Sequence, residues 1–170
     1  AIVFPDANLD VAVKECVKGA WSFNGQRCTA LKVVYVHRDI REAFLEAFAK
    51  ATDALTWGSP LDNVDITPLP ELGKVDTMQS YLREAVDKGA TVVNARGGEV
   101  EGNMMFPAIL HPVDRDTELF REEQFGPLCP VLDFESFEEV LADIAQSDYG
   151  QQVSLFTQDA ATAGMCIDRL

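Results

Sequence analysis

Helix-length apolar stripes alternate with short β-branched runs along this chain of 170 residues. Apolar residues at i, i+3, i+4, i+7, i+8 and i+11 form one helix face that ends near Trp21; they are Leu9, Ala12, Val13, Cys16, Val17 and Ala20. After a turn at Asn24-Gly25, residues 31–36 are largely apolar and β-branched, as is typical of a buried strand. This alternation predicts an α/β fold with a mainly parallel sheet and helices on both faces.

The same alternation continues to the C-terminus. Asp39 can cap a second helix, whose expected core face is Ile40, Phe44, Phe48, Ala51 and Leu55. Further helices are expected over 71–88, closing at Gly89, over 136–146, and from about residue 159. Strands are expected over 91–93, 104–110, 128–134 and 153–156, and Pro107 predicts that the second of these is an edge strand or bulged. With 47% hydrophobic residues, the chain predicts one domain that spans 1–170.

Charge and hydropathy exclude several partners. The formal net charge of −14 and the pI near 4.4 disfavour nucleic acid and anionic lipid, which are bound through clustered Lys and Arg. The longest apolar runs are far below the roughly 20 residues of a membrane span, and the N-terminal pattern is not that of a signal peptide. A cytoplasmic location is therefore expected. An anionic small molecule would need locally placed arginines to bind here.

The four cysteines, Cys16, Cys28, Cys129 and Cys166, include no C-x-x-C pair, and His37 and His111 are the only histidines. No zinc-ligand pattern is present, so no metal is expected. Two disulfides are arithmetically possible, but a chain with this much apolar core has little need of them. We expect free thiols.

Cys28 lies where the chain leaves a turn, between a predicted helix and a predicted strand. Its neighbour Arg27 adds a fixed positive charge, and such surroundings favour the thiolate. Most cysteines are nevertheless small buried hydrophobes. From the residue alone, both interpretations stay open.

Two ordered motifs favour the first interpretation. Gly-Gln-Arg-Cys-Thr-Ala at 25–30 resembles the nucleophile loop of aldehyde dehydrogenases, and residues 2–10 resemble the family segment that precedes it. Glu-Glu-Gln-Phe-Gly-Pro at 122–127 resembles the family's Glu-x-Phe-Gly-Pro signature, in the expected order along the chain. The resemblance continues through Tyr149-Gly150 and 155–159, and so covers nearly the whole chain.

The resemblance implies the roles of the site residues. Cys28 would attack the aldehyde carbon to give a thiohemiacetal, whose oxyanion could accept a hydrogen bond from the Cys28 backbone N–H. Hydride transfer to NADP or NAD would leave a thioester for hydrolysis. Glu123 would bind the nicotinamide ribose hydroxyls, and Phe125 would pack against the cofactor, although a surface acid and a core aromatic are the alternatives. Glu122 is expected to be solvated.

Within the family, the sequence most resembles the NADP-dependent non-phosphorylating glyceraldehyde-3-phosphate dehydrogenases. The similar stretches are 25–30, 65–68 and 102–107. In that branch the arginine beside the nucleophile helps hold the substrate phosphate, which implies substrate binding by Arg27. Thr29, on the other side of the nucleophile, is expected to bind substrate as well. Methylmalonate-semialdehyde dehydrogenases also carry an arginine there, and Asn24 and Gln151-Gln152 depart from the branch, so other semialdehydes remain alternatives.

The resemblance also implies that part of the active site lies elsewhere. The family's general-base glutamate, its oxyanion side-chain amide and its dinucleotide-binding domain precede the segment matched by Ala1. We therefore expect residues 1–170 to be a catalytic-domain fragment of a longer enzyme, which the resemblance implies is a homo-oligomer. The alternatives are a catalytically silent interaction domain and a relative that passes the thioester to another acceptor.

Overall fold

A six-stranded sheet organises the fold in the computed structural model, which describes residues 1–170. The strand order is β3-β6-β7-β2-β1-β8, and every neighbouring pair is parallel except β3 with β6. The strands are β1 (Ile2–Val3), β2 (Val34–His37), β3 (Thr91–Val92), β6 (Ala108–His111), β7 (Leu128–Phe134) and β8 (Leu155–Phe156). The prediction of a mainly parallel sheet is confirmed.

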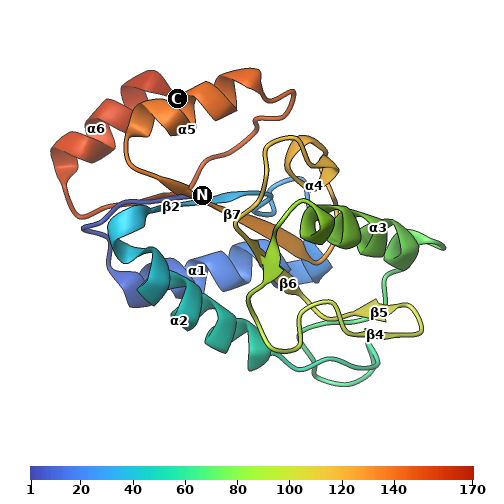
Figure 1. The fold of residues 1–170 in the computed structure, drawn as a ribbon. Helices are drawn as coiled ribbons and strands as arrows, with labels where there is room; N and C mark the ends of the chain where they lie inside the picture. Colours follow the sequence, from blue (N-terminus) through green and yellow to red (C-terminus); the bar gives the residue numbers. More distant parts are fainter.

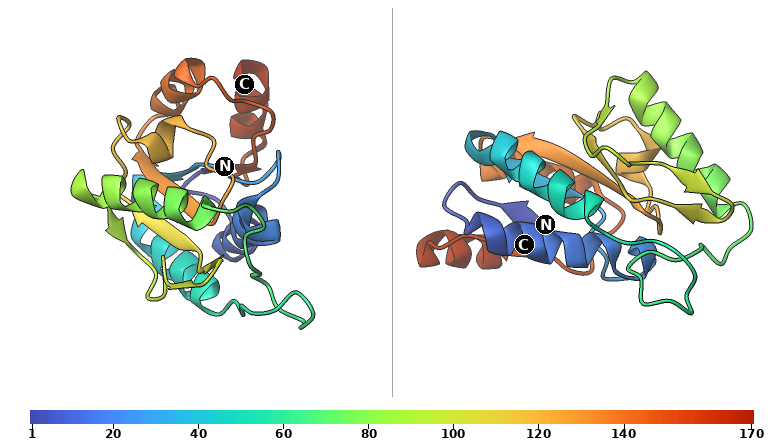
Figure 2. Two further views of the ribbon diagram at one scale, coloured as in Figure 1. Left: turned by 90° about the vertical axis from the view of Figure 1, so that its right-hand side faces the viewer. Right: turned by 90° about the horizontal axis from the view of Figure 1, so that it is seen from below.

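Helices cover both faces of this sheet, as predicted (Figures 1 and 2). On one face lie α1 (Leu9–Trp21) and α2 (Arg41–Asp53), whose apolar side chains join a cluster of 14 buried residues. On the other face lie α3 (Lys74–Asp87), α4 (Glu118–Arg121), α5 (Phe137–Gln146) and α6 (Ala160–Arg169), whose side chains join a cluster of 19. Strand β2 divides its side chains between the two, with Val34 and Val36 in the first cluster and Tyr35 in the second. No helix has the length and apolar character to cross a membrane.

The start of α2 differs from the prediction. Asp39 does not cap the helix, because a 3-10 turn (Arg38–Ile40) comes first and Ile40 occupies the N-cap position. The backbone N–H of Asp39 instead donates to Nδ1 of His37 at 3.3 Å. Other boundaries are close to the predicted ones: α1 ends at Trp21, and Ser136 forms a capping box at the start of α5.

Residues 104–110 form two short strands instead of one. β5 (Met104–Met105) pairs with β4 (Val100–Glu101) in a hairpin at the end of the molecule away from α5 and α6, and β6 begins only at Ala108 (Figure 1). The expectation of an edge strand is wrong, because β6 lies between β3 and β7. Pro107 falls in the gap between the strands, where no ladder bond needs its missing N–H. Its carbonyl accepts a hydrogen bond from Nδ2 of Asn94 at 2.9 Å.

Helix α2 supports the last turn of α1. The ring of Trp21 stacks on Phe48, with centroids 6.0 Å apart and an interplanar angle of 10°. The indole Nε1 of Trp21 donates to Oγ1 of Thr52 at 2.9 Å, and all three residues are buried. Trp21 is the last residue of α1, so these contacts fix the point from which the chain continues toward Cys28.

We expect Phe48→Ala to lower the free energy of unfolding by about 3–5 kcal/mol, because it removes a fully buried ring and leaves a cavity beside Trp21. Urea denaturation followed by circular dichroism measures this change. Glu46→Ala on the exposed face of the same helix is the matched control and should change stability by less than about 0.5 kcal/mol. Equal effects of the two substitutions would contradict this packing.

Candidate active site

Three successive residues in left-handed conformation turn the chain between α1 and Cys28. Phe23, Asn24 and Gly25 have φ angles of 54°, 56° and 72°, and the first two are strained there because they carry a Cβ. Hydrogen bonds to Thr67 offset part of this strain. Nδ2 of Asn24 donates to the Thr67 carbonyl at 2.9 Å, and its Oδ1 accepts from the Thr67 backbone N–H at 3.1 Å. The departure at Asn24 noted in the sequence is thus a fixed, buried contact.

Cys28 follows in a turn closed by a hydrogen bond from the Ala30 N–H to the Arg27 carbonyl at 3.1 Å. Its thiol is exposed, and its backbone N–H donates no hydrogen bond within the chain. The other three thiols are free and buried, as Cys16, Cys129 and Cys166. Burial raises the pKa of the Cys16 thiol to about 11 and that of the Cys129 thiol to about 12. Cys28 is therefore the accessible thiol of the four.

Arg27 and Thr29 flank the thiol. Thr29 is exposed, and Arg27 is partly buried with its guanidinium 5.7 Å from the centroid of the exposed Phe23 ring. Although the chain has 28 Asp and Glu residues, none forms an ion pair with Arg27, and its buried Nε has no hydrogen-bond partner. The guanidinium is available to an anion.

A second turn, residues 122–127, leads into β7. Glu123 is partly buried, and its carboxylate forms no hydrogen bond or ion pair. Phe125 is partly exposed and has a φ of 42°, a strained value for an aromatic residue. Glu122 is exposed, as expected, and accepts a hydrogen bond from the Tyr149 hydroxyl at 3.3 Å. The Glu123 carboxylate thus has no polar partner in the chain. The polar group against the Phe125 ring is the ammonium of Lys32, described below.

The two turns meet because β2 and β7 are parallel neighbours. Val34 pairs with Val131, so the segments that lead into both strands lie at the same edge of the sheet. The backbones touch: a Cβ on Gly25 would lie 2.5 Å from the carbonyl oxygen of Gly126. Gly25 and Gly126, 101 positions apart in sequence, therefore approach more closely than a Cβ at Gly25 would allow.

Lys32 and Gln124 join the turns by polar contacts. Nζ of Lys32 donates to the Gly25 carbonyl at 2.8 Å and lies 4.2 Å from the centroid of the Phe125 ring. Nε2 of the buried Gln124 donates to the carbonyls of Lys32 and Leu128, at 3.1 and 2.7 Å. Neither residue was predicted from the sequence, because Lys32 falls within an apolar run and Gln124 occupies an unassigned position of its motif.

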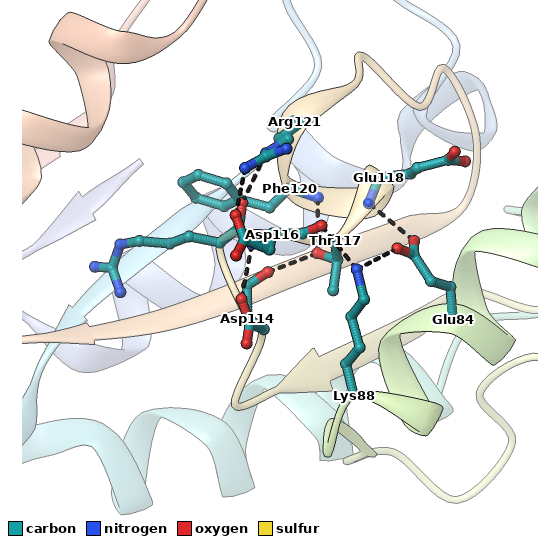
Figure 3. Close-up of polar contacts among 9 residues, drawn as sticks. Glu84, Lys88, Asp114, Asp116, Thr117, Glu118, Phe120 and Arg121 are labelled. Carbon is teal, nitrogen blue, oxygen red and sulfur yellow. Dashed lines mark hydrogen bonds and ion pairs between the residues drawn. The ribbon is translucent and has the colours of Figure 1, made fainter.

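Helix α4 holds the start of the second turn (Figure 3). Its N-cap Thr117 accepts from the Phe120 N–H, and Glu84 of α3 accepts from the Glu118 N–H at 2.8 Å. Lys88 donates to both Glu84 and the Asp116 carbonyl, and its contact with Glu84 lowers the pKa of that carboxyl. Helix α4 was not predicted from the sequence, since its four residues are too few to show a helical period. The threonine N-cap followed by Glu118 was the available signal.

Comparisons with known proteins identify the family of the chain. The model of the aldehyde dehydrogenase family matches residues 1–170. An NADP-dependent glyceraldehyde-3-phosphate dehydrogenase from Streptococcus equinus is 38% identical over 170 residues, which are 100% of this chain and 35% of that protein. A sulfoacetaldehyde dehydrogenase from Neptuniibacter caesariensis is 34% identical over 162 residues, 95% of this chain and 35% of that protein. The chain thus spans about a third of the length of these relatives.

A solved structure has the same fold over nearly the whole chain. The NADP-dependent glyceraldehyde-3-phosphate dehydrogenase from Bacillus halodurans C-125, solved with NADP, superposes with a TM-score of 0.94 at 34% identity. The match covers 99% of this chain and 35% of that one. Since the family model spans every residue and the fold coincides, the chain belongs to the aldehyde dehydrogenase family.

Proposed function

We propose that residues 1–170 are the nucleophile-bearing part of a longer enzyme that oxidises glyceraldehyde 3-phosphate to 3-phosphoglycerate with NADP. One observation carries the proposal: an exposed thiol and an arginine without an acidic partner lie side by side, against a turn with a carboxylate free to bind. The similar glyceraldehyde-3-phosphate dehydrogenases support the choice of substrate and cofactor.

Cys28 is the nucleophile in this proposal. Its sulfur forms a bond to the aldehyde carbon, and the carbonyl oxygen becomes the oxyanion of a thiohemiacetal. The free backbone N–H of Cys28 can donate to that oxyanion. Loss of hydride leaves a thioester, and attack by water releases the carboxylic acid and restores the thiol. The general base, the second oxyanion donor and the dinucleotide-binding domain belong, in this proposal, to the part of the relatives that this chain does not match.

The second turn fits a dinucleotide. The half-buried carboxylate of Glu123 has no partner in the chain, so both its oxygens can accept from ribose hydroxyls. The ring of Phe125 offers a partly exposed face against which the cofactor can pack. When bound, NADP supplies the hydride acceptor.

Arg27 selects an anionic substrate. A planar guanidinium suits a phosphate, and the field of a chain with net charge −14 otherwise opposes any anion. A sulfonated aldehyde is the second candidate, favoured by the similarity to a sulfoacetaldehyde dehydrogenase, because a sulfonate offers the same guanidinium three oxygens.

Cys28 should be the first thiol to react with iodoacetamide at pH 8, because it alone is exposed. A thiol with a pKa of about 11, as for Cys16, has only about one thiolate in a thousand at that pH, and Cys129 has fewer. Peptide mass spectrometry over a time course measures the order of alkylation. If a buried thiol were modified before Cys28, or if Cys28→Ser kept near-normal turnover in the full-length protein, the assignment of Cys28 as the nucleophile would be wrong.

Arg27→Leu in the full-length protein should lower kcat/KM for glyceraldehyde 3-phosphate by about 10- to 150-fold. Glyceraldehyde, which lacks the phosphate, should lose far less, since the substitution removes a contact that only a charged substrate makes. Steady-state kinetics with glyceraldehyde 3-phosphate, sulfoacetaldehyde and glyceraldehyde measures the difference. Arg83→Leu, at an exposed site on α3, is the control and should leave all three unchanged.

An equal loss with charged and uncharged aldehydes would contradict the proposed role of Arg27 and assign it to support of the thiol. In the unsubstituted full-length protein, a higher kcat/KM for sulfoacetaldehyde than for glyceraldehyde 3-phosphate would favour the sulfonated aldehyde as the substrate.

A further inference from the structure

Lys32 makes three contacts that tie the nucleophile loop to the second turn. Its ammonium donates to the carbonyl of Gly25, three residues before Cys28, at 2.8 Å. The same ammonium lies 4.2 Å from the centroid of the Phe125 ring. Its backbone carbonyl accepts from Nε2 of Gln124 at 3.1 Å. One residue therefore contacts both segments of the proposed site.

The placement of this ammonium is costly. Burial is the main cause that lowers the pKa of Lys32; the nearby Glu123 opposes the shift and Lys74 adds to it. No carboxylate forms an ion pair with the ammonium, which is held by a carbonyl and an aromatic ring instead. A lysine side chain ordinarily extends its ammonium into water. Here the ammonium is directed at the Phe125 ring, which indicates a role at that residue.

We propose that Lys32 is a positioning residue, whose cation fixes the Phe125 ring for the cofactor. The inference rests on the proposed function, because it assumes that Phe125 contacts NADP. The strained φ of Phe125 requires such support, since a left-handed aromatic residue relaxes unless its surroundings hold it. A cation over a partly desolvated ring provides it.

The test compares Lys32→Met, Lys32→Gln, Lys32→Arg and the exposed-site control Lys50→Met in the full-length protein. Isothermal titration with NADP, without substrate, should show that Lys32→Met and Lys32→Gln weaken binding by about 5- to 30-fold. Because glutamine keeps a hydrogen-bond donor for the Gly25 carbonyl, the weaker NADP binding of Lys32→Gln measures the effect of the lost positive charge. Lys32→Arg, which keeps the cation, should restore affinity to within about 3-fold of the unsubstituted protein, and Lys50→Met should not change it. In kinetics, KM for NADP should rise more than kcat falls.

A double-mutant cycle tests the contact with Phe125. If Lys32 acts through the ring, Lys32→Met should weaken NADP binding much less in a Phe125→Leu background than in the unsubstituted protein. Unchanged NADP affinity in the Met and Gln variants, an equal loss in the Arg variant, or independent effects of Lys32 and Phe125 would each overturn the proposal. Failure of the proposed function is separate: it would appear as turnover without Cys28, whatever Lys32 does to NADP binding.

Discussion

The parallel pairing of β2 with β7 is the contact on which the proposed site depends. It places the segments that precede both strands at one edge of the sheet, although Cys28 and Glu123 are 95 residues apart in sequence. Ligand sites in open α/β sheets usually lie beyond the carboxyl ends of strands. Here the candidate residues gather at the amino ends, where the chain enters the two strands.

The close approach of two backbone segments fixes how the two turns meet at this edge of the sheet. Gly25 and Gly126 meet with no room for a Cβ, and the polar contacts of Lys32 and Gln124 surround them. Each turn also has its own support from outside. The packing of Trp21, at the end of α1, against α2 supports the first turn, and the hydrogen bond from α4 to α3 supports the second. The strained residues Asn24 and Phe125 therefore lie between fixed elements, as the positioning of reactive groups requires.

The sequence predicted the elements better than their contacts. The apolar stripe of α1 and the run that forms β7 set their bounds correctly, because periodicity reports burial directly. Periodicity does not show which strands pair, so the contact between the two turns was not predicted from the sequence. Pro107 was misplaced for a related reason: its missing N–H excludes a position within a ladder, but it does not distinguish an edge from a gap between strands. Lys32 was not identified as a site residue because it lies within the largely apolar run 31–36, which predicts only a strand.

A trapped acyl-enzyme tests the central claim most directly, namely that the two turns together make Cys28 the nucleophile of an aldehyde oxidation. The full-length protein would be mixed with NADP and glyceraldehyde 3-phosphate and quenched with acid within milliseconds, and its peptides would be weighed by mass spectrometry. We predict a phosphoglyceroyl group on the peptide that contains Cys28, absent when NADP is omitted. NADPH formation with that peptide unmodified at every time point, or with the acyl group on another residue, would contradict the claim.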